Sequence, residues 1–128
     1  MTITEASKKG NTNLVKLYLK NGTDVINDNK YCIIDACFNN HTEVVKALIE
    51  AGADVTVNDN APIRFSLRNS ELVKLLIDSG AVIDDDYNFC LKHSCFYNHI
   101  ETVKVLIDEG VDITTADNYC LRTVCSKG

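Results

Sequence analysis

The sequence predicts an all-α solenoid of stacked helix pairs, because one stretch that reads as a helix with a stop signal occurs four times. Residues 44–55 read VVKALIEAGADV, and residues 14–25, 72–83 and 102–113 follow the same pattern. The glycines that end the helices are spaced 30, 28 and 30 residues apart and are Gly22, Gly52, Gly80 and Gly110. A period in this range is typical of proteins built from stacked repeats.

Each of these stretches is expected to form the longer helix of a pair. In the second copy, Val45, Leu48 and Ile49 recur at i, i+3 and i+4, so they form one apolar stripe. Gly52 follows, and glycine enters the left-handed conformation that ends a helix without a Cβ penalty. The pattern therefore predicts a helix of about ten residues that stops at its glycine.

A shorter helix is expected before each longer one, because the intervening residues repeat as well. The residues ten positions after the glycines are Cys32, Pro62, Cys90 and Cys120. Pro62 suits the first turn of a helix, where its missing N–H costs nothing. The third copy is two residues short, and the loss falls around residues 67–70. We expect a tighter joint there, which bends the stack.

We expect a single domain over residues 1–128, made of four helix pairs plus a final unpaired helix. The repeats are placed at about 1–30, 31–60, 61–88 and 89–118, with a partial copy at 119–128. Solenoid ends usually carry a polar cap. The final helix instead offers Leu121, Val124 and Cys125, which makes it a candidate surface for self-association.

Bulk composition excludes several classes of function. The net charge is −5 and no basic cluster occurs, so a phosphate backbone would be repelled and nucleic-acid binding is not expected. Acidity of this size biases a protein towards basic partners. No run approaches the roughly 18 apolar residues of a membrane span, and the first residues do not read as a signal peptide. We therefore expect an intracellular, cytoplasmic protein with no membrane partner.

The six cysteines follow the repeat with a constant five-residue spacing and are Cys32, Cys37, Cys90, Cys95, Cys120 and Cys125. A residue type that keeps the register of a repeat is expected to serve packing, here as small buried thiols. Disulfides between repeats are not expected, because stacked helices lie about 10 Å apart and bridged residues need Cα atoms within about 7 Å.

A zinc site is the most tempting chemical reading, since Cys90, His93, Cys95 and His99 have the residue types of one. Zinc needs four ligands that converge, whereas Cys90 and Cys95 would point about 140° apart on a helix. No set of nucleophile, base and orienting group is evident, and each glycine serves as a helix stop and not as a phosphate loop. We expect neither a metal, nor a cofactor, nor enzymatic activity.

With these motifs the chain resembles the ankyrin repeat family along its entire length. A repeat of that family opens with Thr-Pro-Leu-His-x-Ala-Ala and continues with Gly-His, an outer helix such as Val-Val-x-Leu-Leu, and Gly-Ala-Asp-Val. The residues on those columns are 61–63, Ala36-Cys37, His41, His99 and Gly52-Ala53-Asp54-Val55. The full Thr-Pro-Leu-His is missing, and the period is shorter than the usual 33 residues or so. The loss lies in the loop, so blunt turns are expected where the family has β-hairpin fingers.

The segment DNYCLR at residues 117–122 is similar to the repeat opening of ankyrin proteins from giant DNA viruses of amoebae, the mimivirus-like group. The resemblance implies a viral protein that acts on a host protein in the host cytoplasm.

The resemblance also implies where a partner binds. In that family the short helices line a concave face, and the two residues after the Ala-Ala column point outward from it. Those positions are Lys8, Lys9, Phe38, Asn39, Phe96 and Tyr97. The aromatic members are either binding hot spots or rings that fold back over the shortened loops.

Two further columns accompany this set. Arg64, Lys92 and Arg122 replace the family's histidine and are expected to brace the loops or form a solvated rim; a basic stripe for acidic partners is the weaker alternative. Tyr31, Phe89 and Tyr119 are expected to pack into space left by the short loops. The function that follows is a non-catalytic protein-interaction module or scaffold. The alternative is a structural protein that self-assembles, as a homodimer, through its uncovered C-terminal helix.

Overall fold

The computed structural model describes residues 2–82 and 86–110, and within them all regular structure is helical. The helices are α1 (Ile3–Lys9), α2 (Thr12–Lys20), α3 (Cys32–Phe38), α4 (Thr42–Glu50), α5 (Val57–Arg64), α6 (Ser70–Asp78), α7 (Asp86–Phe96) and α8 (Ile100–Asp108). The partial copy expected at residues 119–128 lies outside the described residues.

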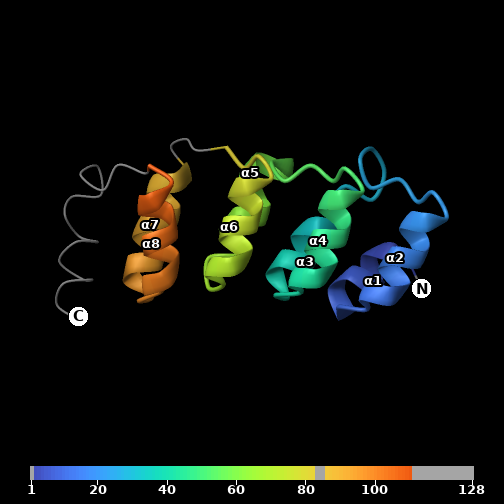
Figure 1. Ribbon diagram of the computed structural model, residues 1–128, viewed down its shortest axis with the longest axis horizontal. Helices are drawn as coiled ribbons and strands as arrows, with labels where there is room; N and C mark the ends of the chain where they lie inside the picture. The colour runs from blue at the N-terminus through green and yellow to red at the C-terminus, as the bar shows by residue number, and fades with distance from the viewer. Residues whose placement is uncertain (1, 83–85, 111–128) are drawn as a thin grey trace.

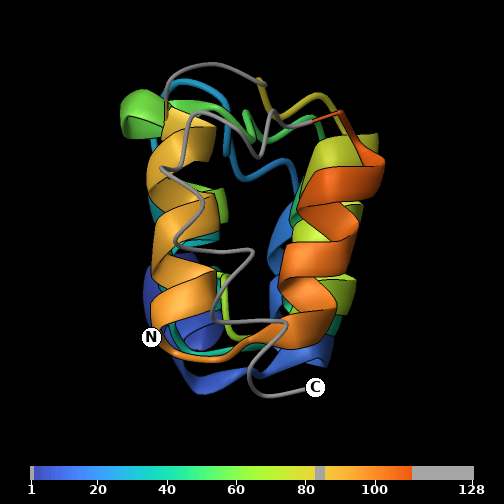
Figure 2. The ribbon, with the colours of Figure 1, turned by 90° about the vertical axis from the view of Figure 1, so that its left-hand side faces the viewer.

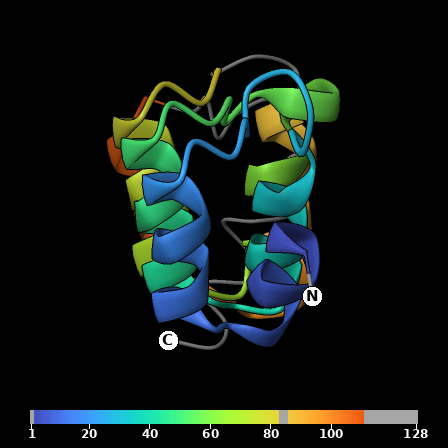
Figure 3. The same ribbon diagram turned by 90° about the vertical axis from the view of Figure 1, so that its right-hand side faces the viewer.

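The helices form two parallel rows, seen from the side in Figure 1 and end-on in Figures 2 and 3. The helices α1, α3, α5 and α7 make one row, called the inner row below, and α2, α4, α6 and α8 make the outer row. The inner helices α1, α3 and α5 are shorter than the nine-residue outer helices, as expected, but that expectation is wrong for α7, which has 11 residues. Consecutive helices pair as α1 with α2, α3 with α4, α5 with α6 and α7 with α8, while α3 packs between α1 and α5. The predicted solenoid of stacked helix pairs is confirmed over the described residues.

The outer helices bury the predicted apolar stripe between the rows. In α4, Val44, Val45, Ala47 and Leu48 are buried, whereas Ile49 is half-buried at the edge of the core. Full burial of a side chain such as Leu48 contributes about 2 kcal/mol. Gly52 follows with a φ of 93°, the left-handed conformation that the sequence predicted.

The loops after the first two outer helices are blunt turns, as expected. Asp24 Oδ1 accepts hydrogen bonds from the backbone N–H groups of Ile26 at 2.8 Å and Asn27 at 3.0 Å. Asp54 Oδ1 accepts from the Thr56 N–H at 2.8 Å and from its hydroxyl at 2.7 Å. These bonds favour the ionised carboxylate, so they lower the pKa of both aspartates. The aspartate of the repeat therefore closes the turn that replaces the hairpin.

The joint between α3 and α4 contains a residue with positive φ and a histidine. Asn40 has a φ of 63°, and the backbone N–H of His41 donates to Ala36 O at 2.9 Å. The His41 ring reaches the previous repeat, where its Nε2 lies 2.9 Å from Lys8 O. A Cβ on Gly10 would lie 2.5 Å from His41 Nδ1, so glycine gives the ring its room. The His41 ring therefore serves as a structural hydrogen-bonding group between the first two repeats.

The third joint is tighter, as its two missing residues predicted. The backbone turns through hydrogen bonds from Ser66 N to Ile63 O at 3.0 Å and from Asn69 N to Ser66 O at 2.9 Å, without a residue in the left-handed region. Helix α5 ends at Arg64, with Phe65 as its C-cap, whereas α3 extends to Phe38. The inner helix of the third repeat therefore ends about one turn early.

Helix α5 also begins irregularly. Asn58, Asp59 and Asn60 have φ values of 54°, 55° and 62°, so the right-handed helix runs from Ala61 onward. Pro62 then lies in the first turn, as predicted, where it has no N–H to satisfy. Arg64 Nη2 donates to Asn58 O at 3.0 Å and holds this left-handed stretch against the helix.

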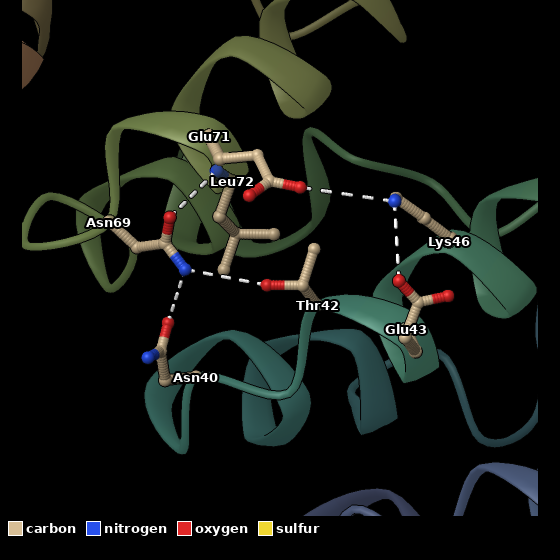
Figure 4. A network of polar contacts seen from close by, with 7 residues as sticks. All are labelled: Asn40, Thr42, Glu43, Lys46, Asn69, Glu71 and Leu72. Carbon is tan, nitrogen blue, oxygen red and sulfur yellow. Dashed lines mark hydrogen bonds and ion pairs between the residues drawn. The ribbon is translucent and has the colours of Figure 1, made fainter.

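Asn69 joins the short third repeat to the second (Figure 4). Its side-chain amide donates to Asn40 Oδ1 at 2.6 Å and to Thr42 Oγ1 at 3.4 Å, while its Oδ1 accepts from Leu72 N at 3.2 Å. The same residue therefore caps α6 and binds the preceding joint. Ion pairs from Lys46 to Glu43 and Glu71, at 3.3 and 3.9 Å, lie beside it and are exposed, so they contribute little.

The cysteines are mostly the buried thiols that the sequence predicted. Cys32, Cys37 and Cys90 are buried, and burial raises the pKa of Cys32 and Cys37 to about 11. The expectation is wrong at Cys95, which is disulfide-bonded. Disulfides were not expected because helix axes lie about 10 Å apart, but residues on the facing sides of two helices can lie closer than their axes.

Thr102 compensates for the short third joint. In the second and fourth repeats, the carbonyls of Cys37 and Cys95 accept from the N–H groups of Asn40 and Asn98, both at 3.1 Å. The third repeat has lost the residue that would donate to the matching Leu67 carbonyl. The buried Thr102 hydroxyl donates to it instead, at 2.7 Å, from a column that is aliphatic in the other outer helices.

We therefore predict that Thr102→Val lowers the free energy of unfolding by about 1–2 kcal/mol, although valine has the same shape, because it leaves a buried carbonyl unpaired. Urea denaturation followed by circular dichroism measures the change. Thr12→Val is the control, since the Thr12 hydroxyl makes only a 3.5 Å contact with Gly10 O, and its loss should be within about 0.5 kcal/mol. Equal effects for the two variants would contradict this role of Thr102.

Candidate functional site

Three predicted aromatic residues stand exposed at the joint end of the inner row. Phe38 is 59% exposed at the end of α3, and Phe96 and Tyr97 are 62% and 58% exposed at the end of α7. The alternative in which these rings fold back over the loops is wrong, because they lie at the opposite end of their helices. Exposed aromatics grouped on one face are typical of a binding surface.

Phe65 belongs to the same surface and was missed by the sequence argument. Its ring meets Phe38 edge-on, with centroids 5.7 Å apart and planes at 77°, and it is 44% exposed. Partner binding was expected at the two positions after the Ala-Ala column, and Phe65 is not one of them. Phe65 reaches this surface because α5 ends early and Phe65 is its C-cap. The two-residue deletion was the signal that could have identified it.

A second aromatic cluster lies on α7 and its joint. The His93 ring lies 4.6 Å from Tyr97, 5.8 Å from Phe89 and 6.4 Å from His99, measured between centroids. Phe96 meets Tyr97 edge-on at 4.9 Å. These side chains form a continuous aromatic wall on the fourth repeat.

The expectation that Tyr31 and Phe89 pack inward is wrong, since each is 53% exposed. Both lie at or near the start of an inner helix, where the blunt loops leave them facing solvent. Lys30 Nζ lies 5.3 Å from the centre of the Tyr31 ring, a cation–π contact. Tyr119 lies outside the described residues.

A hollow of about 280 Å³ separates the Phe38–Phe65 pair from the wall on the fourth repeat. Its lining residues are Phe38, Arg64, Phe65, Leu67, Arg68, His93, Tyr97 and His99. A second hollow of about 320 Å³ adjoins it on α7 and is lined by Phe89, Lys92, His93, Phe96 and Tyr97. The short third repeat leaves the first hollow open, because α5 stops before it can fill the space between α3 and α7.

The structure brings together some of the predicted site residues and not others. Phe38, Arg64 and Tyr97 line the first hollow, and Lys92 and Phe96 line the second. Lys8 and Lys9 are exposed at the end of α1 and line neither hollow, and the Asn39 amide donates to Asp35 O at 2.8 Å. Arg122, Leu121, Val124 and Cys125 lie outside the described residues.

Two arginines frame the hollow. Arg64 braces the loop through Asn58 O, which is one of the roles expected for it. Arg68, which the sequence argument did not single out, donates from Nη2 to Phe38 O at 2.8 Å. Phe38 in the second repeat is equivalent to Lys8 in the first. The bond from Arg68 to Phe38 O therefore corresponds to the contact between His41 and Lys8 O one repeat earlier.

His93 lies between the two hollows and contributes little positive charge at neutral pH. Burial lowers its pKa below the ordinary 6.5, and the neighbouring His99 lowers it further. Its Nδ1 is buried and has no hydrogen-bond partner among the described residues. Among residues 2–82 and 86–110, no three His, Cys, Asp or Glu side chains gather as metal ligands would.

These features define the class of protein as a helical-repeat solenoid with an exposed aromatic surface on its inner row. Residues 2–59 match the family model described as ankyrin repeats (3 copies). The match spans a little under half of the chain, and the helix pairs α5–α6 and α7–α8 beyond it repeat the same helix–joint–helix arrangement.

A relative supports the viral resemblance. The chain is 34% identical over 86 residues to a protein of Acanthamoeba polyphaga mimivirus that is named as an ankyrin repeat protein. The similarity covers 57% of this chain and 28% of the relative, so the chain spans less than a third of that protein's length. Within the described residues, no helix has the length and apolar content that crossing a bilayer requires.

The lowered pKa of His93 predicts a pH dependence of stability. Below 6.5 the unfolded imidazole takes up a proton more readily than the folded one, so the free energy of unfolding falls as the pH decreases through that value. Above it, both states are neutral and His93 contributes no slope. His93→Gln should therefore lose less stability than the wild type between about pH 7.5 and 5.5 in urea titrations. Identical pH slopes for the two proteins would refute the assignment.

Proposed function

We propose that this chain is a non-catalytic protein-interaction module, or scaffold, that binds a partner protein through the joint end of its inner row. Ankyrin repeats are generally protein–protein interaction modules and are typically non-catalytic. The observation that carries the proposal is the exposure of Phe38, Phe96 and Tyr97, each more than half accessible, beside two hollows. Rigid aromatic rings next to hollows are what binding hot spots need.

The similarity to a mimivirus protein supports a more specific version of this role. We propose that the chain is a viral protein and that its partner is a host protein met in the host cytoplasm. The match covers a minor part of the relative, so this version rests on sequence similarity and on the DNYCLR opening.

Partner capture from an amoebal extract tests the proposal. The variant Phe38→Ala/Phe96→Ala/Tyr97→Ala should lose the partner, because it removes the aromatic anchors while leaving the buried core intact. The control is Leu17→Ala/Ile107→Ala, which truncates apolar side chains that are 53% and 41% exposed on the outer row. Circular dichroism verifies that both variants fold.

A partner retained by the wild type and the control, and lost by the triple variant, would support binding at the inner row. If all three proteins retain the same partner, the binding surface lies elsewhere on the chain. If the wild type retains nothing while its mass in light scattering rises with concentration, self-assembly through Leu121, Val124 and Cys125 becomes the better account.

A further inference from the structure

Three outer-row lysines, on α4, α6 and α8, form ion pairs, whereas Lys16 and Lys20 on α2 form none within the part of the chain that the structure describes. Lys46 pairs with Glu43 and Glu71, Lys74 with Asp78 and Glu109, and Lys104 with Glu101. Among the described residues, no ion pair involves the basic side chains of the inner row and its joints, which are Lys8, Lys9, Arg64, Arg68 and Lys92. These side chains therefore carry charge that no acidic side chain of the described chain neutralises.

The inner-row charges are also segregated along the helices. The acidic residues Glu5 and Asp35 lie in first turns, and Asp59 lies in the left-handed stretch that precedes the right-handed part of α5, all near the loops. Lys8, Lys9 and Arg64 lie in last turns, and Arg68 lies in the joint. This order complements the helix dipoles. It also makes the joint end of the row basic in a protein whose net charge is −5.

The hollow of the short third repeat combines this charge with apolar walls. Phe38, Phe65, Leu67 and Tyr97 supply its apolar and aromatic lining. Arg64 and Arg68 reach into the same space, and Lys92 stands over the neighbouring hollow. Each arginine donates one hydrogen bond from Nη2 to a backbone carbonyl, and the Nε of Arg64 is buried, so Arg64 offers a carboxylate the remaining N–H groups of its two Nη atoms.

We propose that the partner segment bound here is an acidic peptide stretch, with an apolar side chain seated in the hollow and flanking Asp or Glu carboxylates facing Arg64, Arg68 and Lys92. The inference rests on the proposed function and specifies its chemistry. It replaces the bias towards basic partners that net charge suggested, because the charge at a binding site depends on local placement and not on the sum over the chain.

Selection from a library of random peptides about twelve residues long, displayed on phage, tests the inference with the folded full chain as bait. The expected peptides carry a net negative charge around one or two apolar residues. A charge-reversing variant, Lys92→Glu, should lower their enrichment at least about tenfold, since it places a like charge against them. Lys92 is exposed and makes no hydrogen bond or ion pair among the described residues, so this variant is expected to fold.

Lys16→Glu is the matched control, because it reverses an exposed charge on the outer row that, like Lys92, forms no ion pair among the described residues, and it should leave the enrichment unchanged. Enrichment of neutral or basic peptides, an unchanged yield with Lys92→Glu, or no enrichment on the wild type would each overturn the acidic inference. One outcome separates the two proposals: the peptides no longer bind the variant Phe38→Ala/Phe96→Ala/Tyr97→Ala but still bind Lys92→Glu. That result would support the proposed function and contradict the acidic inference. Acidic peptides kept by the aromatic triple variant would instead count against the proposed surface itself.

Discussion

Burial between neighbouring helix pairs is the interaction on which the rest of this structure depends. A pair such as α3 and α4 is too small to enclose an apolar core, so each repeat completes the core of the next. Leu48 and Ile33 are fully buried only because the stack continues on both sides of them. Glycine at the end of each outer helix keeps the pairs in register, and His41 and Asn69 tie one joint to its neighbour.

The two-residue deletion in the third repeat has three linked consequences. It ends α5 a turn early, which places Phe65 at the surface beside Phe38. It removes a backbone donor, so that Leu67 O is bonded by the Thr102 hydroxyl of the next outer helix. It also leaves the hollow between the second and fourth repeats, which Arg64 and Arg68 frame. The irregular repeat is therefore the part of the stack where the surface differs most from its neighbours.

The repeat pattern made most of the fold predictable. The apolar periodicity predicted where the outer helices lie, the glycines predicted where these helices end, and the deletion predicted the tight third joint. These features were predictable because they depend on local backbone conformation and burial. The site was less predictable, since exposure depends on what neighbouring repeats cover. For Phe38, Phe96 and Tyr97 the sequence left exposure and packing over the loops both open, and they are exposed. Tyr31 and Phe89 were expected inside and are exposed as well. Phe65 and Arg68 matter only because a helix ends early, and a column-by-column reading misses such residues.

The most direct test of this account is to restore the missing residues by inserting Asn-Asn between Arg68 and Asn69, matching Asn39 and Asn40 of the preceding repeat. The measurement is the affinity of the insertion variant for the captured partner or the selected peptide, after circular dichroism confirms folding. If the short repeat creates the binding hollow, the variant keeps its helical content and loses affinity by at least about tenfold. An unchanged affinity in a folded insertion variant would contradict the account.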